Sequence, residues 1–186
     1  MSKQLIMYGE PTANKVKDSL QRHPSSKNET MARPARMPDA EAICQLVNFY
    51  AERGLMLHRS LESIYESLRD FLVAFDGDRL IGCIALSLSW EGLGEIRSLA
   101  VADGHQNKGV GRALVREAIE QAKSLCLKRI FVLTYEQAFF AKLSFRIVDK
   151  QTLPAKVWRD CIHCPKAEAC DEIAMLLDLN RPPQTS

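Results

Sequence analysis

The stretch from Gly94 to Leu127 constrains the fold of this chain most, because it reads as a strand, a glycine-bearing loop and a long helix. Residues 95–101 (E-I-R-S-L-A-V) alternate apolar and polar side chains until the alternation slips at residues 99–101. A strand that loses its period of two indicates a β-bulge, and bulges are common beside active sites. After a polar loop, apolar residues recur at helical spacing, namely Val110, Ala113, Leu114, Ala118, Ala122 and Leu125.

The junction between the loop and the helix has the pattern Q-x-x-G-x-G. The first N–H groups of a helix lack partners within the helix, and the positive end of the helix dipole lies there. Glycine lets the backbone approach a ligand closely, so the junction suits an anion such as a diphosphate. The alternative is that the glycines only shape a turn. We favour the anion site, formed by Gln106, Asn107, Lys108, Gly109, Val110, Gly111 and Arg112.

The segment V-A-D-G-H-Q-N-K-G-V-G-R-A-L resembles the acetyl-CoA motif of the GNAT superfamily of N-acyltransferases. The family pattern, Q/R-x-x-G-x-G/A at the start of the central helix, is filled at every defining position. The glycine spacing differs from the dinucleotide fingerprint G-x-G-x-x-G. The resemblance implies that acetyl-CoA is the co-substrate, and that the backbone of Leu99, Ala100 and Val101 contacts its pantetheine arm.

The composition of the chain argues against some classes of protein. The 186 residues suit one domain, and 46% hydrophobic residues can build a core. A net charge of +2 is too mild to indicate nucleic acid, and no run is long and apolar enough to span a membrane. Without a secretory signal, we expect a cytoplasmic protein. We expect a polar, poorly ordered extension at residues 1–30, a GNAT domain at residues 31–180 and a tail at residues 181–186.

The remaining elements follow the order expected of a mixed α/β fold. An edge strand at residues 32–36 precedes a helix from Asp39, as N-cap, to Gly54, and Ser60 caps a second helix. Three antiparallel strands follow, with a hairpin at residues 76–78, and the central helix then crosses to a parallel strand at residues 129–135. A short helix and two strands complete a mostly antiparallel twisted sheet with flanking helices, which is also the GNAT order.

A narrower resemblance is to the acetyltransferase domain of bacterial N-acetylglutamate synthases, in a short stand-alone form. It rests on His58-Arg59-Ser60, D-G-D-R-L-I-G-C-I-A-L, E-I-R-S-L-A-V, F-V-L-T and Leu153-Pro154. It implies transfer of acetyl to the α-amine of L-glutamate, a step of arginine biosynthesis. Many GNAT enzymes have a proton-donating tyrosine where this chain has Phe140, and the synthases lack that tyrosine too. The acceptor could instead be another small amine or a protein amine, and the chain could instead be a non-catalytic sensor or partner module that binds acetyl-CoA. A homodimer is also possible in each case.

Glu95 is the candidate general base, because a partly desolvated glutamate has a raised pKa and suits proton abstraction from an ammonium. The resemblance implies the same role, and the alternative is a surface glutamate at the strand edge. Thr134 is the candidate acid by its match to a hydroxyl position of the synthases, and Tyr135 is the second choice. Either hydroxyl could equally be structural.

Two arginines are candidates for binding the carboxylates of the substrate, since a guanidinium binds a carboxylate in a bidentate manner. Arg59 rests on the family match, whereas Arg97 rests on its place in the central strand, and a surface arginine is the alternative for both. A backbone N–H near Leu99 would polarise the thioester carbonyl.

The cysteines allow one further hypothesis. Cys161, His163, Cys164 and Cys170 could hold a zinc ion, but a second C-x-x-C is missing and Cys161 stands very close to His163. We therefore prefer packing or an oxidisable pair to a metal site. The other three cysteines, Cys44, Cys83 and Cys126, lie in apolar patterns and are expected to be buried.

Overall fold

The computed structural model describes residues 32–154 and 170–180, so the expected extension at residues 1–30 and the tail at 181–186 lie outside the described residues. Within these described residues, seven strands form one sheet in the order β1-β2-β3-β4-β5-β7-β6. All neighbours are antiparallel except β4 and β5, which are parallel, as the crossover through the central helix predicts. The strands are β1 (Arg33–Pro34), β2 (Phe71–Asp76), β3 (Arg79–Trp90), β4 (Leu93–Val101), β5 (Arg129–Thr134), β6 (Arg146–Ile147) and β7 (Ile173–Asp178).

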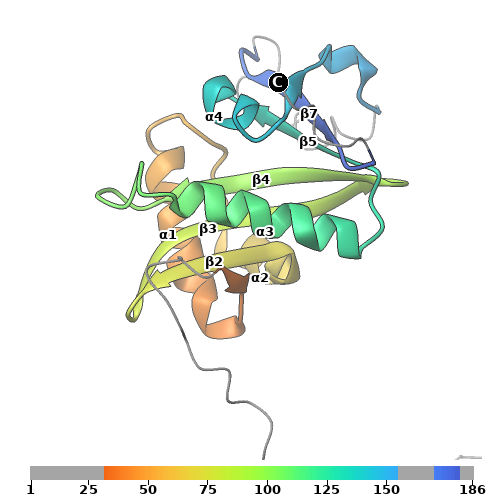
Figure 1. Ribbon diagram of the computed structural model, residues 1–186. Helices are drawn as coiled ribbons and strands as arrows, with labels where there is room; N and C mark the ends of the chain where they lie inside the picture. Colours follow the sequence, from red (N-terminus) through yellow and green to blue (C-terminus); the bar gives the residue numbers. More distant parts are fainter. Residues whose placement is uncertain (1–31, 155–169, 181–186) are drawn as a thin grey trace, which may run out of the picture.

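Helices cover both faces of this sheet (Figure 1). The long helix α3 packs on one face, and α1 and α2 pack on the other. The α-helices are α1 (Ala40–Ala51), α2 (Leu61–Glu66), α3 (Val110–Ser124) and α4 (Gln137–Ala141). Single 3₁₀ turns are η1 (Met37–Asp39), η2 (Leu68–Asp70) and η3 (Lys150–Thr152). No helix within the described residues is long and apolar enough to cross a lipid bilayer. The mixed α/β architecture predicted from the sequence is confirmed.

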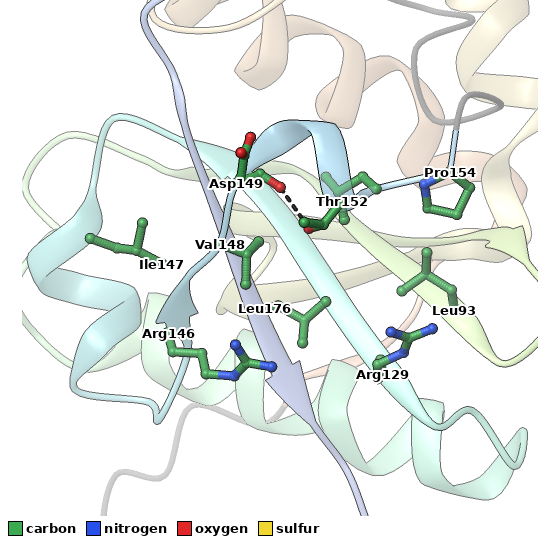
Figure 2. Close-up of a pocket in the computed structure, with 10 residues that line it drawn as sticks. Leu93, Arg129, Arg146, Ile147, Val148, Asp149, Thr152, Pro154 and Leu176 are labelled. Carbon is green, nitrogen blue, oxygen red and sulfur yellow. Dashed lines mark hydrogen bonds between the residues drawn. The ribbon is translucent and has the colours of Figure 1, made fainter.

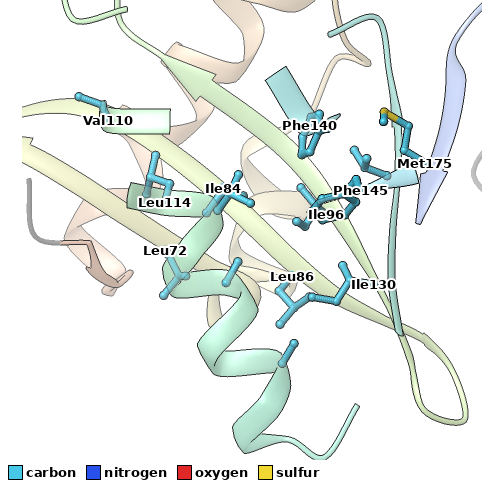
Figure 3. Packing of buried hydrophobic residues seen from close by; sticks show 14 of the residues in the cluster. Leu72, Ile84, Leu86, Ile96, Val110, Leu114, Ile130, Phe140, Phe145 and Met175 are labelled. Atoms are coloured by element: carbon cyan, nitrogen blue, oxygen red, sulfur yellow. The ribbon is translucent and has the colours of Figure 1, made fainter. Parts of the chain in front are cut away.

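The core beneath α3 explains why this helix lies on the sheet. Its apolar stripe, including Val110, Leu114 and Ala118, packs on alternate residues of the central strands such as Ile84, Ile96 and Ile130 (Figure 3). Residues two apart on a strand point to the same face, so one helix stripe meets one set of strand positions. The faces of the central strands can therefore be assigned: Ile96 lies on the α3 face, and its neighbours in sequence lie on the opposite face.

The opposite face carries two separate apolar clusters. Under α1 and α2, residues of β2, β3 and β4 pack with Ile43, Val47 and Ile64. A smaller cluster covers β4, β5 and β7, with Phe131 in its centre and Leu153 packed over it. Between these two clusters, polar side chains lie on the sheet face, among them Ser87 of β3 and Glu95 and Arg97 of β4. Of the predicted site residues on β4, Glu95 and Arg97 lie on this polar strip, whereas Leu99 and Val101 pack on the α3 face.

Two details of the helix termini differ from the sequence predictions. Leu125 is 50% exposed, although the helical spacing placed it on the apolar face, because α3 ends at Ser124 and Leu127 fills the core instead. Asp39 stands at the N-cap position of α1, but its carboxylate accepts no bond from that helix. It accepts instead from the Arg33 guanidinium (2.7 and 3.0 Å) and from the N–H of Arg36 (2.7 Å).

The prediction for the three cysteines is confirmed only in part. Cys83 is fully buried, and Cys44 is half-buried beside the backbone of Arg59. The expectation that Cys126 is buried is wrong, because it is exposed. Its backbone has a φ of +57°, which reverses the chain between α3 and β5 and turns the side chain away from the core.

Candidate active site

The two parallel strands at the centre of the sheet separate part-way along their length. They are paired from Leu93 with Arg129 to Ile96 with Val132. Beyond that point β4 continues along β3, and β5 continues along β7, so no further β4–β5 pair exists among the described residues. Figure 1 shows β5 turning away from β4 toward the end where the α3 loop begins. This opening exposes backbone groups of β4 that would otherwise bind β5.

A β-bulge lies directly at this opening. Arg97 pairs with Ala85 and Ala100 pairs with Cys83, so β4 uses three residue steps where β3 uses two. Ser98 carries the irregularity, with a φ of +50°. The extra residue returns Leu99 to the α3 face, three positions after Ile96, which explains the slip in the sequence pattern. The predicted bulge is confirmed.

The thiol of Cys83 supports the bulge from beneath. Its Sγ lies 3.6 Å from the carbonyl oxygen of Ser98, and the side chain is fully buried. Burial raises the pKa of this thiol to about 12, so it stays protonated and can donate to that carbonyl. Cys83 is thus a packing residue that holds the bulge and not a nucleophile.

The loop that follows β4 has the backbone shape of an anion-binding nest. Gly104, Asn107 and Gly109 all have positive φ, at +80°, +60° and +90°. The first intrahelical bond of α3 runs from the Ala113 N–H to the Gly109 carbonyl (2.9 Å), so the N–H groups of residues 110–112 precede it. A Cβ built on Gly109 would meet nothing within 4 Å. The loop therefore leaves open space above the N-terminus of α3, and the exposed Lys108 and Arg112 add positive charge.

Gln106 differs from its neighbours in this loop because its side chain turns back to the protein. Its Nε2 donates to the Tyr50 hydroxyl (2.8 Å), which also contacts the Val101 carbonyl and, at 3.2 Å, the Asp103 carboxylate. Burial raises the pKa of Tyr50. This cluster joins α1 to the loop and to the end of β4. Tyr50 was not predicted as a site residue, because in the sequence it is only a tyrosine within the apolar stripe of a helix.

Glu95 and Arg97 lie on the sheet face opposite α3, on the polar strip between the two apolar clusters. Glu95 stands opposite Ser87 on β3 and Phe131 on β5. The Arg97 Nε lies 4.0 Å from the Glu95 Oε2, and their side chains are 25% and 17% exposed. Both side chains are thus largely shielded from bulk water.

Arg59 reaches the same region from the segment between α1 and α2. Its guanidinium donates to the Ser63 and Ser67 hydroxyls (3.1 and 2.8 Å) and to the Ser63 carbonyl (2.9 Å). Asp70, at the end of η2, has its pKa raised by partial burial, which the charges of Arg97 and Arg59 oppose. The structure thus brings both predicted arginines near one carboxylate. Asp70 was missed, because a lone aspartate before a strand carries no sequence signal.

The two candidate acids occupy different surroundings. Thr134 ends β5 opposite Ile173, which packs with the α3 core, so its side chain lies on the α3 face. Its hydroxyl oxygen accepts from the Glu136 N–H (2.9 Å), which leaves the hydroxyl hydrogen to be donated elsewhere. The Tyr135 hydroxyl already donates to the Asp171 carboxylate (2.8 Å). Of the two, Thr134 fits the role better.

The predicted zinc ligands are mostly outside the described residues, where Cys161, His163 and Cys164 fall. Cys170 is described, and both its carbonyl oxygen (2.9 Å) and its Sγ (3.4 Å) accept from the Lys150 ammonium. Within the described stretches, no three potential metal ligands gather at one point.

A strand opening with a bulge, followed by a nest at a helix N-terminus, is the arrangement that the sequence motif predicts. The pattern of the acetyltransferase (GNAT) family matches residues 40–145, more than half of the chain, and spans all of these features. The chain belongs to the GNAT acetyltransferase family. It is an acetyl-CoA-dependent N-acetyltransferase, and the residues of its nest fit the phosphates of that co-substrate.

Three known proteins are similar to this GNAT chain over more than two thirds of its length. An uncharacterized N-acetyltransferase of Chlorobaculum tepidum is 44% identical over 81% of this chain and 97% of its own length. An amino-acid acetyltransferase of Mycobacterium tuberculosis is 38% identical over 69% of this chain and 75% of its own length. The N-acetylglutamate synthase of Neisseria gonorrhoeae, solved with coenzyme A and N-acetyl-glutamate, superposes with a TM-score of 0.75 at 26% identity. That match covers 84% of this chain but 37% of the synthase.

Proposed function

We propose that this GNAT enzyme transfers acetyl from acetyl-CoA to the α-amine of an amino acid, and that L-glutamate is the acceptor. The observation that carries the proposal is the placing of Glu95 beside Arg97 on the face opposite α3, where the charges of Arg97 and Arg59 both act on Asp70. A region with a candidate base and two guanidiniums suits a molecule that has both an ammonium and carboxylate groups. The amino-acid acetyltransferase and the N-acetylglutamate synthase among the relatives support the same acceptor class.

Glu95 acts as the general base in this mechanism. The acceptor arrives as an ammonium and must lose a proton before its nitrogen can attack. Glu95 lies one residue before the last β4–β5 pair, on the acceptor face, and takes this proton directly or through one water.

Arg59 and Arg97 bind the carboxylates of the acceptor. Arg59 is oriented by Ser63 and Ser67, so little side-chain freedom is lost when it binds. Arg97 lies beside the base and would hold a carboxylate close to the reacting amine. Asp70 offsets part of their positive charge in the absence of acceptor.

The coenzyme approaches from the α3 face and supplies an activated acetyl thioester. The nest at residues 104–112 would hold the diphosphate, and Gln106 would act indirectly, by fixing the loop to Tyr50. Exposed backbone groups of β4 next to the bulge would bind the pantetheine arm, and an N–H near Leu99 would stabilise the developing oxyanion. Removing one such donor in other enzymes costs roughly 2.7–4 kcal/mol. Thr134, on the same face, donates a proton to the leaving thiolate.

The test is release of free thiol from acetyl-CoA by the purified chain in the presence of single acceptors. The panel includes L-glutamate, L-glutamine, L-aspartate, L-lysine, a polyamine and a peptide amine, and mass spectrometry identifies the product. We expect N-acetyl-L-glutamate, formed with the highest kcat/KM. Preference for a polyamine or peptide would overturn the amino-acid assignment. Binding of acetyl-CoA without turnover of any acceptor would instead support a sensor.

A further inference from the structure

A cavity of about 490 Å³ opens at the far end of the central strands, and the mechanism above does not use it. Leu93 of β4 and Leu176 of β7 form its floor, and Val148 and Pro154, from the segment after β6, stand at its rim (Figure 2). Its lining combines aliphatic residues with polar ones, and Arg129 and Arg146 bring two positive charges to it. Small-molecule sites usually combine apolar contacts with a small number of placed polar groups.

The two arginines are not engaged elsewhere in the described part of the chain. Neither guanidinium has a hydrogen-bond or ion-pair partner there, although Arg129 stands directly opposite Asp178 on β7. Asp178 accepts instead from the N–H of Asn180 (3.0 Å). In Figure 2, Arg129 extends toward Leu93 and Arg146 toward Leu176. Both cations therefore border the apolar floor.

Asp149 is the one carboxylate among the described residues that line the cavity, and it does not neutralise the arginines. Asp149 caps the turn η3 by accepting from the Gln151 N–H (2.9 Å), and Figure 2 shows its carboxylate directed away from both arginines. Two guanidiniums against one occupied carboxylate leave the cavity with an excess of positive charge. An uncharged occupant would gain nothing from this charge, whereas an anion would.

The cavity is separate from the place where acetyl transfer occurs. Arg129 begins β5 and Thr134 ends it, and five residues of strand span about 16 Å. Phe131, directly opposite Glu95, is fully buried and packs with Leu153, so an apolar layer lies between Arg129 and the catalytic carboxylate. An occupant of the cavity would not reach the thioester.

We propose that this cavity is a second binding site, for a small molecule that carries a carboxylate or phosphate group on an apolar body. The arginines bind the anionic group through charge-assisted hydrogen bonds, and the leucine floor takes the apolar part. The site is independent of the proposed acceptor, because its residues lie outside the acetyl-transfer machinery.

The test uses three probes with the same six-carbon chain: hexanoate, hexyl phosphate and hexanol. Binding to the full chain is followed by two-dimensional NMR, which reports shifts at the cavity residues. We expect shifts with both anions and none with hexanol, and the tighter anion identifies the preferred head group. In the double variant Arg129→Gln/Arg146→Gln, affinity falls about tenfold or more, because hydrogen bonds to charged groups are lost. The matched control Arg116→Gln, on the exposed side of α3, keeps wild-type affinity.

Four results would overturn the proposal. The first is that neither anion shifts the cavity residues, and the second is that hexanol binds as well as hexanoate. The third is unchanged affinity in a folded double variant, with folding checked by thermal unfolding. The fourth is a raised KM for the amino-acid acceptor in the double variant, which would make the cavity part of the acceptor site. The first three results do not depend on which amine is acetylated, so failure in the binding measurements is distinct from failure of the proposed function.

Discussion

Gly109 and Gly111 allow a test of the proposed anion-binding nest, because only Gly109 has a backbone conformation that requires glycine. Gly109 has a φ of +90°, and Gly111 lies in the first turn of α3 with no positive φ. A side chain at Gly109 would meet empty space, so the whole cost of Gly109→Ala is backbone strain. For an L-residue this conformation costs roughly 1–2 kcal/mol. A change of this size is a factor of about 5–30 in an equilibrium constant.

Gly111→Ala is the matched control. Its Cβ would lie 3.5 Å from the Phe139 ring and 3.6 Å from a Val101 methyl, which are ordinary van der Waals distances. Alanine also favours the helix over glycine by up to about 1 kcal/mol. We therefore expect Gly111→Ala to be neutral or stabilising, and to keep the affinity for acetyl-CoA.

The assay combines urea unfolding of the free chain with calorimetric titration of acetyl-CoA. If the loop keeps its shape in Gly109→Ala, the strain appears in the free energy of unfolding. If the loop relaxes, the same cost appears as weaker coenzyme binding. The sum of the two losses is the predicted quantity, roughly 1–2 kcal/mol. Equal sums for both variants, or a larger loss in Gly111→Ala, would refute the assignment of the nest.

Three further predictions concern catalysis and stability. Glu95→Gln should lower kcat by about 10²- to 10⁴-fold while coenzyme affinity stays unchanged, and wild-type turnover across the pH range would exclude the base role. Thr134→Val should slow thiol release more than Tyr135→Phe does, and an unchanged rate would remove Thr134 as the acid. The Arg33 guanidinium lowers the pKa of Asp39 below its ordinary value of 3.8, so ionised Asp39 contributes its full stabilisation of the fold above that pH. This contribution is lost as the pH falls through the lowered pKa. In Asp39→Asn, the free energy of unfolding measured with urea should therefore depend less on pH in this range.

The order of the elements could be predicted because it depends on local patterns. Apolar periodicity fixed the strands and α3, and a hairpin signal at Asp76-Gly77-Asp78 fixed how β2 and β3 pair. The bulge was predictable for the same reason, since an extra residue shifts the alternation by one. Leu125 and Cys126 were predicted wrongly, because a period says which face a helix buries but not where the helix ends.

The parts of the site that the sequence did not indicate depend on contacts between distant segments. Tyr50 and Gln106 are 56 residues apart and meet only because α1 packs against the end of β4. Asp70 joins Arg59 and Arg97 through the packing of η2 on the sheet. The cavity arginines lie on β5 and β6, which are neighbours of β7 and not of each other. No local pattern encodes any of these contacts.

The bulge links the two halves of the proposed reaction. Without the extra residue at Ser98, strict alternation would put Leu99 on the same face as Glu95 and Arg97. With it, Leu99 returns to the α3 face, while Glu95 stays on the acceptor face. One strand can thus present its carboxylate to an acceptor on one side and its backbone to the coenzyme on the other. Because β5 has separated at this point, the two substrates can meet in the gap between β4 and β5. The opening and the bulge are therefore both required, and neither alone would bring an amine to a thioester.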